Sequence, residues 1–229
     1  MTDNRLTIRN QQVLYDKKWK KFLGKAWLFR YIPFVEFAIA AGSMASGNVK
    51  ETSDFDVIIG VREGRIFTAR FFAILGFGFF GFRRKRLSHK EDAADKICLN
   101  HFITKPSYML KPPYTDSWRE LYRNLVPVWG DQVKINEFLM ANESWAGPVA
   151  VFKDDLRYDR RDDSWVKKIR EFFLGGRFGD AVERMLKFVQ VRKIEYTLAS
   201  SKLGFKPRVS YSDSELEFHP DRRKFENGH

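Results

Sequence analysis

The chain has 229 residues, of which 44% are hydrophobic and 31% are charged, and its formal net charge is +12. This length suffices for one large domain or two small ones, and the composition excludes an intrinsically disordered chain. The positive charge favours polyanionic partners such as nucleotides, nucleic acids or anionic lipid headgroups, although a basic surface can also serve solubility alone.

The single cysteine of the sequence, Cys98, lies within an apolar run. One thiol cannot form an internal disulfide, which fits a reducing compartment. Since the N-terminal sequence also has no apolar stretch of the signal-peptide type, we expect a cytoplasmic protein. We interpret Cys98 as a small core residue rather than as a nucleophile.

The first half of the chain alternates between helical and strand patterns. Apolar residues at helical spacing predict a helix over residues 11–31, which Pro33 ends. The elements expected after it are a strand over residues 34–42, a short helix and loop over 43–53, a strand over 54–61, a helix over about 66–82 and a strand over 96–104.

One segment of this half is unusually apolar. The run from Phe71 to Phe82 is uninterrupted and is followed by four basic residues at 83–86. It is too short for a membrane-spanning helix, which needs about 20 residues. We therefore expect a buried helix, and the alternative is an interfacial segment whose basic end meets anionic headgroups.

After Pro106 the pattern changes to a proline-containing linker followed by helices. Ser117, with Glu120 three positions later, has the capping pattern that begins a helix. Asp180 predicts in the same way the start of a long amphipathic helix that runs to about residue 203.

Two units follow from these patterns, an α/β part over residues 1–110 and a mostly helical module over residues 111–229 with a polar, irregular tail. The tail concentrates charged residues and a histidine in a short piece, namely Asp213, His219, Asp221, Arg222 and Arg223, of which His219 or Arg222 could lie near phosphate. We leave open whether it reaches back into a cleft or is a frayed terminus.

The stretch around residues 40–59 contains the residues that most clearly indicate a chemical function. Residues two apart in a strand point to the same side, so Asp54 and Asp56 present both carboxylates to one face while Phe55 points toward a core. Two carboxylates this close repel each other unless a cation lies between them, and Mg²⁺ prefers such oxygen ligands. Gly42 permits close backbone approach to a ligand, and Ser43 offers a hydroxyl for phosphate. Together these groups suit phosphoryl or nucleotidyl transfer.

The same stretch resembles the signature of the nucleotidyltransferase superfamily related to DNA polymerase beta. The match consists of Gly42 and Ser43, ten intervening residues, and the run Asp54-Phe55-Asp56-Val57. The resemblance implies an α+β fold with a mixed sheet flanked by helices. It also implies that Asp54 and Asp56 hold catalytic Mg²⁺ and that the Gly-Ser pair binds a nucleoside triphosphate. We add Lys50 and Ser53 as candidate nucleotide-binding residues.

In one respect the sequence departs from that family, which has a third carboxylate on a later strand. Here Asn100 occupies the expected position, and an amide can orient a hydroxyl but cannot take a proton. His101 could act as a base or be an ordinary strand histidine, and Asp95 lies just before the strand.

The acceptor of the transferred group, whether a small molecule, RNA or protein, is left open by the sequence. The alternative function is that of an inactive member of the same fold that binds RNA or a protein partner through its basic surface. Basic clusters interleaved with aromatic residues support that alternative, although such clusters are also found on ordinary solvated faces; they lie at residues 17–21, 83–86 and 157–161.

Overall fold

The computed structural model describes residues 2–84, 93–112, 114–149, 155–200 and 208–219. The elements of the first part are α1 (Thr2–Ala26), the 3-10 helix η1 (Trp27–Tyr31), β1 (Val35–Ala40), α2 (Gly42–Ala45), β2 (Phe55–Val61), α3 (Ile66–Phe79), β3 (Ile97–Ile103) and η2 (Lys105–Ser107). Those of the second part are α4 (Asp116–Arg123), β4 (Val126–Gly130), α5 (Gln132–Ala146), α6 (Trp165–Phe173), α7 (Gly176–Ser200), β5 (Arg208–Tyr211) and β6 (Glu215–His219).

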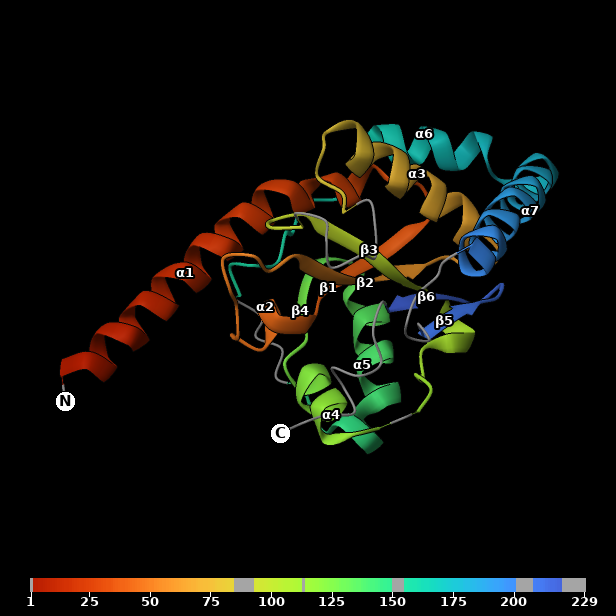
Figure 1. Ribbon diagram of the computed structural model, residues 1–229. Coiled ribbons are helices and arrows are strands. Elements are labelled where there is room, and N and C mark those ends of the chain that lie inside the picture. Colours follow the sequence, from red (N-terminus) through yellow and green to blue (C-terminus); the bar gives the residue numbers. More distant parts are fainter. Residues whose placement is uncertain (1, 85–92, 113, 150–154, 201–207, 220–229) are drawn as a thin grey trace.

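These strands form one six-stranded mixed sheet in the order β4-β1-β2-β3-β6-β5. The pair β2–β3 is parallel and the other neighbouring pairs are antiparallel. Helices α1, α3 and α7 cover one face of the sheet, while α4 and α5 cover the other (Figure 1). The chain therefore has an α+β architecture, as its sequence predicts.

Each face of the sheet buries its own apolar cluster. On the first face Phe55 packs edge-to-face against Phe22 of α1, with ring centroids 5.4 Å apart. On the second face Phe37 packs against Phe138 of α5, at 5.9 Å. Because successive strand residues point to opposite faces, the alternation along β1 and β2 supplies both clusters.

The second half of the chain is less separate than the sequence predicts. Strand β4 pairs with β1, and β6 pairs with β3, so both edges of the sheet come from residues after 110. The expected irregular tail is wrong for residues 208–219, which form the β5–β6 hairpin. Leu216 and Phe218 alternate with Glu215 and Glu217, which is a strand pattern. In the sequence the two glutamates are typical of a solvated segment, but in the structure both are buried. Asp221, Arg222 and Arg223 lie outside the described residues.

Two helix starts also differ from the expected ones. Helix α4 begins after Thr115, whose side chain accepts from the backbone N–H of Trp118, rather than at Ser117. Helix α7 begins at Gly176 instead of Asp180. Glu183 has a different task from capping its own helix, because it accepts from two backbone N–H groups at the N-terminus of α3, each at 2.8 Å. A carboxylate at that end of a helix is favourable because it satisfies exposed donors and meets the positive end of the dipole.

The apolar run that begins at Phe71 is only partly buried, so the expectation of a buried helix holds for one of its sides. Helix α3 buries one side, including Ala73 and Phe77, against the sheet. Its other side, including Leu75 and Phe79, is exposed. Within the described residues, no helix is both long and apolar enough to cross a membrane.

Candidate functional site

The two aspartates lie where β2 begins. Asp54 directly precedes the strand and Asp56 is its second residue. Phe55 between them is fully buried against α1, so the two carboxylates stand on the other side of the strand. Both aspartates are partly exposed, which leaves them accessible to a ligand.

Gly42 brings the backbone against one of these carboxylates. The backbone N–H of Ala41 donates to the carbonyl of Asp56 at 3.0 Å, which ties the start of α2 to β2. Gly42 has a φ of +67°, in the left-handed region. A Cβ at this position would overlap Asp56 Oδ2 and would lie 3.1 Å from Cγ of the same residue. Only glycine combines this backbone conformation with this approach.

The two serines lie together at the same place. Ser43 Oγ donates to Ser53 Oγ at 3.4 Å, and Ser53 Oγ accepts from the backbone N–H of Lys50 at 3.0 Å. These contacts join the turn after β1 to the loop before β2. The described contact of Lys50 is through its backbone, and the residue is exposed.

Helix α1 anchors this loop by side chains that bind its carbonyl groups. Lys18 is 1% exposed and donates to the carbonyls of Glu51 and Ser53, at 2.6 and 2.9 Å. Gln11, two turns earlier, donates to two further loop carbonyls, those of Gly47 and Val49. A loop without regular structure thus has its backbone acceptors satisfied from one helix, which fixes the position of Ser53.

A bulge in β3 places Asn100 beside the aspartates. Asp56 is opposite Cys98 in the parallel pair, but Ile58 is opposite His101, so β3 has one extra residue between these points. Asn100 is buried, and its Nδ2 donates to Asp56 Oδ1 at 3.2 Å. The structure therefore brings together Gly42, Ser43, Ser53, Asp54, Asp56 and Asn100.

The two alternatives for a third functional group are engaged elsewhere. His101 is buried, and its Nε2 lies 3.4 Å from a carboxylate oxygen of Glu215 on the neighbouring strand. Asp95 has a φ of +60° and forms ion pairs with Lys18 and Lys21. The described ion pairs of its carboxylate are thus with α1, while its backbone N–H donates to the carbonyl of Ser53 at 3.1 Å.

Cys98 lies nearer to the two aspartates than the sequence suggests. It is buried, as expected of a core residue, yet ligand atoms of Asp54, Asp56 and Cys98 all lie within 4.8 Å of one another. Burial raises the pKa of the thiol well above its ordinary value, and the carboxylates of Asp56 and Asp54 raise it further. The group next to the aspartates is thus a neutral thiol. The sequence signal that could have indicated this closeness to the aspartates is the position of Cys98 two residues before Asn100.

The second residue that sequence reasoning missed is Arg84. Its Nη1 donates to Asp54 Oδ2 at 2.6 Å. Burial lowers the pKa of Arg84, but attraction to the carboxylates of Asp54 and Asp56 outweighs it, and the pKa lies above its ordinary value. This arginine belongs to the basic run at 83–86, of which residues 85 and 86 lie outside the described part. Arg84 offsets the repulsion between the two aspartates.

Much of the remaining basic sequence is used in internal contacts. In the cluster at 157–161, Arg157 pairs with Asp155 and Arg161 pairs with Asp159. In the cluster at 17–21, Lys18 is buried in the contacts described above. These two clusters therefore provide less free positive charge than their sequences indicate.

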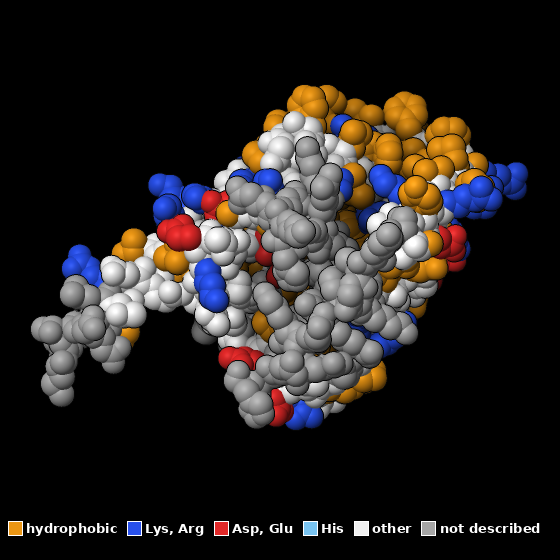
Figure 2. Space-filling view, in the orientation of Figure 1, with side chains coloured by type: hydrophobic (Ala, Val, Ile, Leu, Met, Phe, Trp, Pro, Cys, Tyr) orange, Lys and Arg blue, Asp and Glu red, His pale blue; other side chains and the backbone are white. Residues whose placement is uncertain are grey.

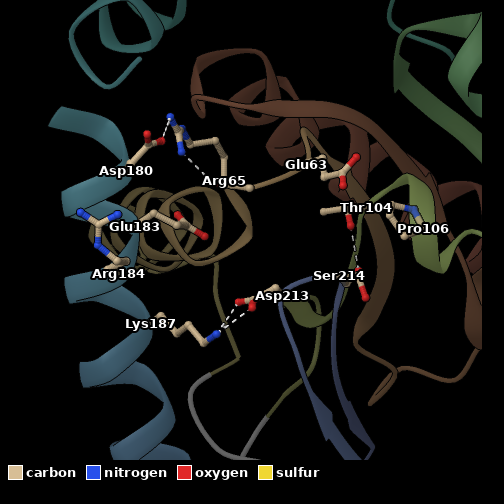
Figure 3. A pocket seen from close by; sticks show the side chains of 11 residues that line it. Glu63, Arg65, Thr104, Pro106, Asp180, Glu183, Arg184, Lys187, Asp213 and Ser214 are labelled. Atoms are coloured by element: carbon tan, nitrogen blue, oxygen red, sulfur yellow. Dashed lines mark hydrogen bonds and ion pairs between the residues drawn. The ribbon is translucent and has the colours of Figure 1, made fainter. Parts of the chain in front are cut away.

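Two surface cavities, of about 480 and 640 Å³, lie away from the aspartates. Figure 3 shows the smaller one, between the start of α3, helix α7 and the turn of the β5–β6 hairpin. Two ion pairs join residues that line this cavity, Arg65 with Asp180 and Lys187 with Asp213. The larger one is lined by the start of β1, by the end of β4 and by residues 158–163, among others.

No family model, curated protein or solved structure matches this chain. The function must therefore be argued from the geometry and chemistry of its own residues.

Proposed function

We propose that the protein is a Mg²⁺-dependent nucleotidyltransferase that moves a nucleoside monophosphate from a nucleoside triphosphate to an acceptor hydroxyl. The observation that carries this proposal is the close approach of Gly42 to the Asp56 carboxylate, beside Asp54. A phosphate-binding turn and a pair of metal-binding carboxylates are the two parts that such a transfer requires.

The donor atoms at this place fit Mg²⁺. Asp54 and Asp56 offer hard carboxylate oxygens, and both residues are partly exposed. Cys98 is a poor ligand for this ion, because its sulfur is a soft donor. When bound, Mg²⁺ would neutralise charge on the phosphate oxygens.

The chain's own residues would bind and orient the triphosphate. Ser43 and Ser53 bring their hydroxyls together at the turn that follows Gly42, where they would contact phosphate. Lys50 would contribute positive charge from the loop. In the transfer, the acceptor oxygen would bond to the α-phosphorus, the bond to the bridging oxygen would break, and pyrophosphate would leave with that electron pair. The hydroxyl proton would pass to water, since Asn100 cannot accept it.

A second function is favoured by the contact between Asn100 and Asp56. A neutral amide that donates to a metal-binding carboxylate supports an inactive site. Such a protein would have kept the fold and would act through its basic surface, on RNA or on a protein partner.

The first test is calorimetric titration of ATP, GTP, CTP and UTP, with and without Mg²⁺. We expect Mg²⁺-dependent binding of at least one nucleotide, weakened at least about tenfold in the isosteric double variant Asp54→Asn with Asp56→Asn. The matched control is Asp162→Asn, which removes an exposed carboxylate in the 155–164 segment. Unchanged Mg²⁺-dependent binding in the double variant would contradict the proposal.

Release of pyrophosphate separates the two functions. Labelled nucleotide incubated with small hydroxyl compounds, RNA and protein should transfer label and release pyrophosphate if the protein is a transferase. Binding without release supports the inactive site. RNA binding that depends on salt but neither on Mg²⁺ nor on the two aspartates supports the second function and removes the first.

A further inference from the structure

Helices α3, α6 and α7 leave a large apolar surface uncovered. Figure 2 shows hydrophobic side chains gathered over this side of the molecule, with basic side chains beside them. The exposed members on α3 and its C-cap are Phe71, Leu75, Phe79 and Phe80; those on α6 are Trp165, Ile169, Phe172 and Phe173; those on α7 are Phe178, Met185, Phe188, Val189 and Tyr196. We call these residues the aromatic surface. Exposed large apolar side chains gathered in one patch on a folded protein mark a site of interaction.

The three helices form one continuous layer. Helix α3 is bound to α7 through Gln190, which accepts from Arg70 and donates to the carbonyl of Phe67. Helix α6 lies beside α3, because the guanidinium of Arg170 stacks over the ring of Phe72, 5.5 Å from its centroid. The aromatic surface therefore belongs to packed helices and not to a loose segment.

The charges on the same helices are strongly biased. Six cations of α6 and α7 are exposed, namely Lys168, Arg170, Arg177, Arg184, Arg192 and Lys193. Three of the four acids on these helices are engaged in contacts: Glu171 pairs with Arg62, Asp180 pairs with Arg65, and Glu183 caps α3. Glu195 is the one exposed acid among the described side chains of these two helices. The outer face thus combines aromatic rings with an excess of positive charge.

We propose that the aromatic surface docks on an anionic lipid membrane. Aromatic and aliphatic side chains next to lysine and arginine are the composition by which helices lie in the headgroup region, the rings entering the acyl boundary and the cations meeting acidic lipids. The helices would lie along the surface without crossing it.

Two other occupants fit the same residues less well. A second copy of the chain in a two-fold contact would bring this cationic face against itself, which is repulsive. Single-stranded nucleic acid would use the cations and the rings, but bases stack on flat faces and gain little from Ile169, Met185 and Val189. A lipid surface uses all three kinds of side chain.

The test is co-flotation of the full chain with vesicles, one set made of phosphatidylcholine and one of equal parts phosphatidylcholine and phosphatidylglycerol. We expect flotation with the anionic vesicles, reduced by high salt, and none with phosphatidylcholine alone. In the variant Phe172→Ser with Phe173→Ser, whose two rings are 80% and 66% exposed, we expect at least about a tenfold loss of vesicle affinity. In Lys168→Glu with Arg177→Glu we expect a similar loss.

Matched controls keep the same chemistry at other places. Val133→Ser with Met140→Ser alters two exposed apolar residues of α5, on the opposite face of the sheet, and Arg9→Glu with Lys20→Glu alters two exposed cations of α1. Both controls should float as the wild type does, and circular dichroism should show that every variant is folded. The proposal is overturned if the wild type does not float, or if the controls lose as much affinity as the variants.

Two further measurements on the same proteins identify the other occupants. If the wild type is a dimer in solution and Phe172→Ser with Phe173→Ser makes it monomeric without changing flotation, a second copy covers this face and the lipid proposal is wrong. If the wild type binds oligouridylate through these rings and does not float, the surface is a nucleic-acid platform and the lipid proposal is equally wrong.

Discussion

Replacement of Gly42 by alanine tests the contact on which the candidate site depends. The new Cβ would overlap Asp56 Oδ2 and would lie 3.1 Å from both Cβ and Cγ of that residue. The Asp56 carboxylate must therefore rotate away from the turn. Since its Oδ1 accepts from Asn100, the rotation also disturbs that hydrogen bond.

The expected size of the effect follows from two contributions. A left-handed conformation costs an alanine about 1–2 kcal/mol of folding free energy. Forcing the Asp56 side chain out of its rotamer costs about 0.5–1.5 kcal/mol more. Gly64→Ala is a matched control, because Gly64 also has a positive φ, +72°, but nothing lies within 4 Å of its added Cβ. The control should therefore show the backbone contribution alone.

The two variants are compared by thermal unfolding and by nucleotide titration with Mg²⁺. For a chain of this length each kcal/mol lowers Tm by about 2–4 °C, so Gly42→Ala should unfold at a lower temperature than Gly64→Ala. Gly42→Ala should also weaken Mg²⁺-nucleotide binding, whereas Gly64→Ala should leave it unchanged. If the two variants lose the same stability and bind nucleotide equally well, the approach of Gly42 to Asp56 has no importance and the reasoning fails.

Two further predictions concern charged groups around the site. Burial raises the pKa of the Asp95 carboxyl, but hydrogen bonds from Lys21 and Lys18 lower it more, so the pKa lies below its ordinary value of 3.8. A carboxyl whose pKa is lower in the folded state stabilises the fold at pH values above the unfolded pKa, and this stabilisation disappears as the pH falls through the folded pKa. Denaturant unfolding at about pH 5 and about pH 3 should therefore show that the free energy of unfolding falls less in Asp95→Asn than in the wild type. Arg84→Gln removes the cation paired with Asp54, so Mg²⁺ without nucleotide should bind about threefold to tenfold more tightly by calorimetry, and equal affinity would mean that this pair does not compete with the ion.

The elements of the first half could be predicted because each has a local signal. The apolar run after Asp56 and the run around Cys98 gave two strands at nearly their observed bounds. The edges of the sheet could not be predicted in this way. Strand β4 contains Pro127 and β6 carries two buried glutamates, so neither reads as a core strand until its neighbours are known. Glu217 pairs with Arg208 of the neighbouring strand β5, and Glu215 pairs with Lys111, 104 residues away in the sequence.

The candidate site shows the same difference between local signals and contacts of distant segments. The residues from Gly42 to Asp56 lie within one stretch, and their grouping was expected from strand alternation and from the family signature that the stretch resembles. Asn100 was also predicted, but its contact with Asp56 depends on the bulge in β3, which no sequence pattern indicated. Arg84 reaches Asp54 from a separate segment after α3, and single-sequence periodicity carries no information on such a contact.

The balance of charge at the aspartates gives Arg84 a part in either proposed function. Two carboxylates held this close are unfavourable alone, and one guanidinium together with the amide of Asn100 stabilises them. In the proposed transferase, a divalent cation bound by the two carboxylates would add positive charge to that of Arg84, which suits a triphosphate. In an inactive descendant no cation would be needed, and Arg84 would serve only to hold the aspartates. The response of Mg²⁺ affinity to Arg84→Gln therefore indicates whether the carboxylates still serve to bind metal.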